Sequence, residues 1–138
     1  LDQGIAASLS WLALDFERGL GFRFEMAVED IELDDGRATY LFRAAQELLI
    51  NIALYAAAET VWLSLTADGD GCRLAIGDDG SGFDPAAPRA DKSLGLLRLA
   101  EQANRFSGRL VIDAAPGRGT TVEIVLPLTT HGMPTRAT

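Results

Sequence analysis

The chain has 138 residues, of which 48% are hydrophobic and 23% charged, a composition typical of a globular domain with a core. Its formal net charge of −8 argues against a nucleic-acid partner, because nucleic-acid-binding surfaces are usually basic. The same charge does not exclude a nucleotide, since backbone N–H groups bind phosphate without net positive charge. One cysteine and one histidine argue against an internal disulfide and against a zinc site.

No apolar run is long enough to span a bilayer, since the longest, residues 48–58, is interrupted by Asn51. The chain shows no signal peptide and begins with Leu1 rather than Met. We therefore expect a piece of a longer protein, with this piece cytoplasmic whether or not the parent is membrane-anchored. We expect one domain over residues 1–128 and a disordered tail over residues 129–138.

The first elements alternate between helical and strand patterns. Residues 3–19 carry apolar side chains at i+3 and i+4 steps, which predicts an amphipathic helix. Gly19 and Gly21 are natural stops for it. Residues 22–28 alternate apolar and polar side chains, which predicts a strand, and an acidic loop follows over residues 29–36.

A long central helix is predicted over residues 38–57, and it is apolar on almost every side. Glu47 and Asn51 interrupt the apolar surface one turn apart, and Tyr55 follows after another turn. A buried carboxylate is costly unless it has a partner or faces a wet cavity. The polar stripe formed by Glu47, Asn51 and Tyr55 therefore indicates either a local polar partner within the core or a ligand site.

The second half of the chain contains two hairpins, a long loop and a helix. The run Asp68-Gly69-Asp70-Gly71 predicts a tight hairpin turn, because Gly and Asp tolerate positive φ. Residues 78–93 hold several Gly and Pro residues and predict an irregular stretch, and loops of this length in compact domains are usually functional. The remaining expected elements are strands at 60–66 and 72–77, a helix at 94–106 ended by Ser107-Gly108, and strands at 109–113 and 120–126.

The order of elements predicts an α+β two-layer sandwich. In this arrangement, three helices cover one face of a mixed, mostly antiparallel sheet.

Three segments offer groups that suit a nucleotide. The amide oxygen of Asn51 is a suitable ligand for Mg²⁺. Glu47, one turn away, can orient or deprotonate a water or hydroxyl. Asp78, directly after a strand, can accept a hydrogen bond from the exocyclic amine of adenine, whereas guanine presents a carbonyl oxygen there.

Glycines complete the pattern. Gly80 and Gly82 let the backbone pass close to a flat base, and Gly95, expected to open a helix, would expose N–H groups to phosphate. Taken singly these patterns are common, because Asp-Asp-Gly-Ser-Gly is most often a turn and a Glu-x-x-x-Asn pair usually has no function. Their order in one chain favours a nucleotide site over a purely structural module.

The combination resembles the ATP-binding catalytic domain of bacterial sensor histidine kinases, within the superfamily of gyrase, mismatch-repair and chaperone ATPases. LFRAAQELLINIALYAAAETVWLSL is similar to the family's N box, and DDGSGFDP is similar to its first glycine box. SLGLLRLAEQANRFSGRLVIDAAPGRGTTVEIVLP is similar to the second glycine box and closing strands. The short loop between the glycine boxes most resembles the subgroup that pairs with helix-turn-helix response regulators.

The resemblance implies the Bergerat fold, with ATP and Mg²⁺ as ligands and residues 84–93 as a lid. It implies that Glu47 is the catalytic base, that Asn51 is the Mg²⁺ ligand, that Asp78 reads adenine and that Thr120 supports the base. The nucleotide-binding residues it implies are Asn51, Tyr55, Asp78, Gly80, Gly82, Lys92, Gly95, Leu96 and Thr120.

Three features depart from the family pattern. Tyr55 stands where the family usually has His or Lys, and Tyr is neutral at pH 7, so phosphate stabilisation is weakened or passes to Arg89 or Lys92. Ser93 stands where the first glycine of the second glycine box is expected. Ala100 and Gln102 replace basic residues that are common in the following helix. These departures bear on turnover more than on adenine binding.

The family's phosphoacceptor histidine lies in a dimeric helical domain that precedes the ATP-binding domain. The only histidine here, His131, follows the last expected strand, and we expect it to be a solvated bystander. The implied partners are therefore the parent's dimerisation domain and, through the parent, a response regulator, with this fragment alone monomeric or weakly associated. The alternatives are a degenerate nucleotide-binding regulatory module without phosphotransfer, or a stand-alone ATPase or anti-sigma-factor-type kinase of the same superfamily.

Overall fold

Three helices and five strands make up the part of the chain that the computed structural model describes. That part comprises residues 4–21, 23–55, 57–80, 90–114 and 119–128, with the backbone alone for Leu20, Tyr55 and residues 90–94. The elements are α1 Ile5–Leu20, β1 Arg23–Val28, α2 Asp35–Tyr55, β2 Thr60–Asp68, β3 Gly71–Asp78, α3 Ala90–Arg105, β4 Arg109–Ala114 and β5 Thr120–Pro127.

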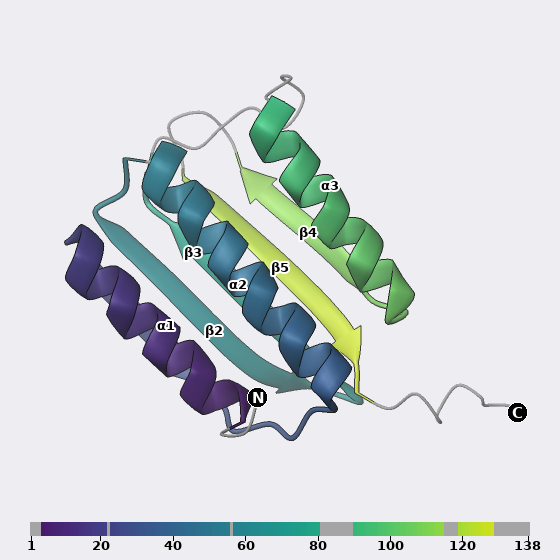
Figure 1. Cartoon of the computed structure of the whole chain (residues 1–138). Coiled ribbons are helices and arrows are strands. Elements are labelled where there is room, and N and C mark those ends of the chain that lie inside the picture. The colour runs from purple at the N-terminus through teal and green to yellow at the C-terminus, as the bar shows by residue number, and fades with distance from the viewer. Residues whose placement is uncertain (1–3, 22, 56, 81–89, 115–118, 129–138) are drawn as a thin grey trace, which may run out of the picture.

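The strands form one mixed sheet in the order β1-β2-β3-β5-β4. β1 pairs with β2 in parallel, and every other neighbouring pair is antiparallel. The helices lie side by side on one face of this sheet, with α2 in the middle (Figure 1). The expected α+β sandwich, with helices covering one face of a mixed and mostly antiparallel sheet, is confirmed.

The core lies between the helical layer and the sheet. β2 alternates buried and half-buried side chains, so that Leu63 and Leu65 point to the helices, and α2 contributes Leu41 and Leu49 from its inner face. Each such fully buried side chain stabilises the fold by roughly 1.5–3 kcal/mol. Cys72 of β3 is part of this core, as expected, and its burial raises the pKa of its thiol to about 11.

The end of α1 and the start of α2 differ from the bounds that the sequence predicted, because a flanking residue caps each of them. α1 runs through Gly19 and ends at Leu20, where Gly21 caps it with a left-handed φ of 77° and donates its N–H to the Glu17 carbonyl at 3.1 Å. α2 begins three residues before the expected start, because Asp34 caps it. The Asp34 carboxylate accepts the Arg37 N–H at 3.2 Å, as an N-cap side chain does.

α3 begins at Ala90, four residues before the expected start. The expectation of an irregular stretch over residues 78–93 is therefore wrong for residues 90–93. These four residues include neither Gly nor Pro, so nothing in them opposes a helix. The expected stop is confirmed, since Ser107 has a φ of 62° and Gly108 donates its N–H to the Ala103 carbonyl at 2.8 Å.

Both hairpins lie where the sequence predicted them. The β2–β3 strands extend to the pair Asp68↔Gly71, so the turn holds two residues, and Gly69 takes the positive φ of 61°. β4 and β5 pair over the full length of β4. Phe22, residues 84–89 of the expected lid, and the expected tail over residues 129–138 with His131 lie outside the described residues.

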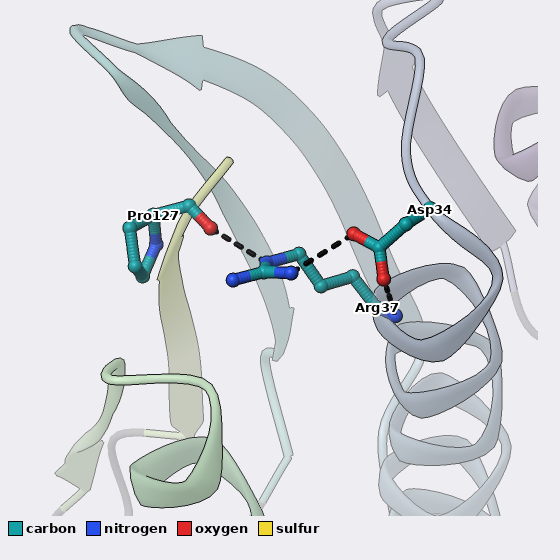
Figure 2. A network of polar contacts seen from close by, with 3 residues as sticks. All are labelled: Asp34, Arg37 and Pro127. Carbon is teal, nitrogen blue, oxygen red and sulfur yellow. Dashed lines mark hydrogen bonds and ion pairs between the residues drawn. The ribbon is translucent and has the colours of Figure 1, made fainter. Parts of the chain in front are cut away.

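A buried arginine joins three elements at one end of the helical layer. Arg37, only 2% exposed, donates from Nε to the Pro127 carbonyl at 2.7 Å and from Nη1 to the Asp34 carboxylate at 2.9 Å (Figure 2). Its guanidinium also lies 5.2 Å from the centre of the Phe106 ring. The start of α2, the end of β5 and the end of α3 are thereby held together.

Candidate functional site

Glu47 and Asn51 lie one turn apart on α2, as the helical spacing predicted, and both are half-buried. Their neighbours Leu48 and Leu49 are buried in the core. The polar stripe therefore runs along the flank of α2 rather than through the apolar centre of the molecule. Tyr55 is the last residue of α2, and its side chain lies outside the described part.

The seam between α2 and α3 fixes where Glu47 lies. The buried Tyr40 hydroxyl donates to the Leu99 carbonyl at 2.7 Å, and the Tyr40 and Phe106 rings are 5.6 Å apart. Burial raises the pKa of Tyr40, so the hydroxyl remains a donor at every physiological pH. One turn before Leu99, a Cβ added to Gly95 would fall on the Glu47 carboxylate. The absence of a side chain at Gly95 leaves the space that this carboxylate occupies.

Gly95 is placed differently from the expectation. It is the sixth residue of α3 and does not open the helix, so the expectation that its N–H would be exposed at a helix N-terminus is wrong. Only the first four N–H groups of a helix lack an intrahelical partner, and these belong to residues 90–93. Leu96, the next residue, is 7% exposed and packs in the core.

The end of β3 brings Asp78 and Thr120 together. Asp78 is the last residue of β3, is 3% exposed, and pairs across the sheet with Thr120, the first residue of β5. One carboxylate oxygen of Asp78 accepts the N–H of Gly80 at 2.8 Å, an Asx-turn that fixes how the side chain points. The two residues that the resemblance assigns to the adenine end of the site are thus direct neighbours.

Gly119 makes this pairing possible. Its φ of 80° disfavours any other residue, and a Cβ there would collide with the carbonyl oxygen of Asp78. Gly119 directly precedes Thr120, yet it was not among the expected site residues. Its part is to let the start of β5 lie against the end of β3.

Asp79 is a second residue that the sequence did not predict. Its Oδ1 accepts the N–H groups of Thr60 and Glu59, each at 2.9 Å, and its own N–H donates to the Thr60 carbonyl at 3.2 Å. The bonds from Thr60 and Glu59 hold the pKa of the Asp79 carboxyl below its ordinary value. Only the pairing register between β2 and β3, which the sequence does not reveal, identifies these partners.

Glu47 and Asn51 lie on α2, and Gly95 lies on α3. The C-terminal end of α2 and the N-terminal end of α3 lie at the same end of the helical layer (Figure 1). Of the other expected site residues, Gly82 and the side chain of Lys92 lie outside the described part. Within the described residues, no group of three His, Cys, Asp or Glu side chains is placed to hold a metal ion.

Residues 36–130 match the family of histidine kinase-, DNA gyrase B- and HSP90-like ATPases. The chain belongs to this ATPase family. The matched residues run from the first turn of α2 to just beyond β5, so they include every element that carries a candidate site residue. Membership of this family implies ATP as the ligand of the site.

Curated relatives of this ATPase domain are sensor kinases. The chain is 28% identical over 126 residues to the sensor histidine kinase LiaS of Bacillus subtilis, covering 91% of this chain and 35% of that protein. It is 35% identical over 119 residues to the signal transduction histidine-protein kinase/phosphatase DegS of Brevibacillus brevis, covering 86% of this chain and 28% of that protein. The chain thus spans about a third of the length of these relatives.

Solved structures show the same fold. The histidine kinase domain of the blue-light activated histidine kinase EL346 from Erythrobacter litoralis aligns over 91% of this chain and 61% of that one, with a TM-score of 0.75 at 20% identity. The histidine kinase AdeS of Acinetobacter baumannii aligns over 91% of this chain and 64% of that one, with a TM-score of 0.69 at 15% identity. The resemblance to the ATP-binding domain of histidine kinases is confirmed. No described helix is both long and apolar enough to cross a membrane.

Proposed function

We propose that the chain is the catalytic domain of a two-component sensor histidine kinase, which binds Mg-ATP and donates the γ-phosphoryl group to a histidine in a separate dimerisation domain. The observation that carries the proposal is the placement of a buried carboxylate, Asp78, beside Thr120, together with a second carboxylate, Glu47, at the α2–α3 seam. Membership of the ATPase family and relatives that are sensor histidine kinases support it.

The adenine end of the site is assigned to the end of β3. Asp78 is nearly inaccessible and its orientation is fixed by Gly80, so it offers a preorganised acceptor for the exocyclic amine of adenine. Thr120 lies beside it and supports the base. Gly80, and Gly82 by the resemblance of its motif to the first glycine box, are assigned to the plane of the base, where larger side chains would interfere.

The phosphate end is assigned to α2 and α3. Mg²⁺ would neutralise charge on the β- and γ-phosphoryl oxygens. The neutral amide oxygen of Asn51 suits this ion, which takes few protein ligands and completes its shell with waters and phosphate oxygens. Tyr55 and Lys92 are assigned to the remaining phosphate end. Gly95 would contribute by leaving room for the Glu47 carboxylate, and Leu96 by packing α3 on the core.

Glu47 is assigned as the catalytic base. Its carboxylate accepts the proton that the acceptor histidine loses, while the histidine nitrogen bonds to the γ-phosphorus and the bond to ADP breaks. In the full kinase, the acceptor histidine belongs to the dimerisation domain. A helix-turn-helix response regulator then receives the phosphoryl group through the parent protein.

The adenine assignment is tested by titration calorimetry with Mg-ATP and Mg-GTP. We expect ATP to bind at least about tenfold more tightly than GTP, because a buried charged acceptor discriminates strongly between an amine and a carbonyl. Asp78→Asn should weaken ATP binding by a similar factor. Thermal unfolding of the variant provides the control that it remains folded. Equal affinities for ATP and GTP, or a folded Asp78→Asn variant that binds ATP normally, would contradict the proposal.

A regulatory nucleotide-binding module without phosphotransfer is the second candidate. The observation that favours it is Tyr55 at the end of α2, where the kinases usually carry a cationic side chain. Such a module would bind ATP through Asp78 and control a partner through binding alone. A protein that binds Mg-ATP yet transfers no phosphate to an acceptor histidine would support this candidate.

A further inference from the structure

The two halves of the proposed site lie on elements that a short turn connects. α2 carries Glu47 and Asn51 and ends at Tyr55, and β2 begins at Thr60 beside the end of β3. Within this turn Ala57 has a φ of 52°, which is unfavourable for a residue with a Cβ. A turn that contains a residue in this conformation needs bonds from outside to hold it.

Asp79 supplies such bonds. It follows Asp78 directly, and its carboxylate accepts the N–H of Glu59, the last residue of the turn, and the N–H of Thr60, the first residue of β2, at 2.9 Å each. Its own N–H donates to the Thr60 carbonyl. Asp79, the residue next to Asp78, is thus hydrogen-bonded to the segment that follows α2.

We propose that Asp79 is a positioning residue, which holds the end of α2 in register with the end of β3 so that one Mg-ATP molecule meets both halves of the site. The inference rests on the proposed nucleotide-binding function. It adds a specific device to that function, a carboxylate that touches no nucleotide but sets the relative position of Asp78 and Asn51. Small displacements of binding groups cost large factors in affinity, so loss of this contact should appear in nucleotide binding.

Glu29 offers a matched control. Its carboxylate accepts the N–H of Ala67 at 3.0 Å, so it also joins an exposed side chain to the backbone of β2. This contact lies near the opposite end of β2, whereas Asp79 bonds to the start of β2. A purely structural loss should therefore be similar for Asp79→Ala and Glu29→Ala, and a positioning effect should be confined to Asp79.

The test is calorimetric titration of Mg-ATP into the wild-type chain, Asp79→Ala, Asp79→Asn and Glu29→Ala, with thermal unfolding measured alongside. We expect Asp79→Ala to weaken Mg-ATP binding roughly tenfold. Asp79→Asn keeps an oxygen that can accept both N–H groups, so its affinity should stay within about threefold of wild type. Glu29→Ala should stay within about twofold, even if its unfolding temperature falls as much as that of Asp79→Ala.

The outcomes separate this inference from the function on which it rests. A wild-type chain that does not bind Mg-ATP overturns the proposed function and the role of Asp79 with it. A wild-type chain that binds while Asp79→Ala binds equally well overturns only the role of Asp79. The same role is overturned if Asp79→Asn is as weak as Asp79→Ala, or if Glu29→Ala loses as much affinity.

Discussion

The contact between Gly95 and Glu47 couples a helix interior to the proposed chemistry. Glycine in the middle of a helix is unfavourable by about 1 kcal/mol relative to alanine. At position 95 glycine is nevertheless favoured by packing, because a Cβ would occupy the position of the Glu47 carboxylate. The atom in the way is the far end of a flexible side chain, so the protein can accommodate alanine by moving Glu47.

Gly95→Ala should therefore leave stability intact and impair phosphotransfer. We expect the free energy of unfolding to stay constant or to rise by up to about 1 kcal/mol. The rate of phosphoryl transfer to a separate acceptor domain should fall roughly tenfold to a hundredfold, because a displaced general base loses much of its contribution. Denaturant unfolding and transfer of label from γ-labelled ATP measure the two quantities.

Gly19→Ala is the matched control for this variant. Gly19 also lies within a helix, α1, and a Cβ there would meet nothing within 4 Å. It should stabilise the chain without changing transfer. If Gly95→Ala transfers phosphate as fast as Gly19→Ala, the position of the Glu47 carboxylate does not matter, and its assignment as the base loses its support.

Local spacing predicted the residues of the site better than their contacts. The i, i+4 relation of Glu47 and Asn51 is a property of one helix and was visible in the sequence. The partners of Asp79 depend on the register between two strands, and the space beside Gly95 depends on how two helices pack. Those relations are set by tertiary structure, so no motif of a single segment reveals them.

Asp34 both caps the N-terminus of α2 and forms an ion pair with Arg37. The Asp34 carboxylate accepts the backbone N–H of Arg37 and also binds its buried guanidinium, while the Asp34 side chain is 51% exposed. Arg37 Nη2 has no hydrogen-bond partner among the described residues, so Arg37 depends on its bonds to Asp34 and Pro127. Loss of Asp34 should therefore loosen the anchor shown in Figure 2.

Asp34→Ala should lower the free energy of unfolding by roughly 1–2 kcal/mol, since an N-cap is lost and an exposed partner contributes modestly to an ion pair. Asp34→Asn retains a capping oxygen and should cost less. Urea denaturation of both variants measures these values. Equal losses for Ala and Asn would show that the charge of Asp34, rather than its capping oxygen, provides the stabilisation.

The same carboxyl predicts a pH dependence. Burial raises the pKa of Asp34, but the hydrogen bonds and charge of Arg37 outweigh this and hold it below the ordinary 3.8. The folded state therefore favours the ionised form, so the contribution is present above about pH 4 and is lost as pH falls through the folded pKa. The stability difference between wild type and Asp34→Asn should be constant above about pH 5 and shrink below pH 4. A difference that grows on acidification would contradict this sign.

Helix starts were the least predictable feature of the elements. The strands and both hairpins followed from alternation and turn residues, because these signals are local. α2 and α3 both begin earlier than their apolar periodicity indicated. Periodicity reports the residues that face the core, whereas first turns project beyond it and are decided by caps such as Asp34.

In the molecule as a whole, the proposed binding roles are divided between the sheet and the helical layer. The sheet supplies the base-reading end through β3 and β5, and the helices supply the phosphate end through α2 and α3. All of these groups lie within the matched family segment. The chain spans only about a third of the length of its relatives. In the proposed reaction, the phosphoacceptor histidine belongs to a separate dimerisation domain.

The isolated chain should accordingly take up no stable phosphate from γ-labelled Mg-ATP. Addition of the parent's helical dimerisation domain should produce acid-labile label on that domain, because its histidine then meets the γ-phosphoryl group. Glu47→Gln should reduce this transfer by at least about a hundredfold while ATP still binds, since it removes the base and preserves the shape of the side chain. Tyr55→His should accelerate transfer if the missing cation limits the wild-type rate. Label on His131 of the chain alone would overturn the expectation that this residue is a bystander. Binding of both partners without any transfer would rule out the kinase function and favour the regulatory module.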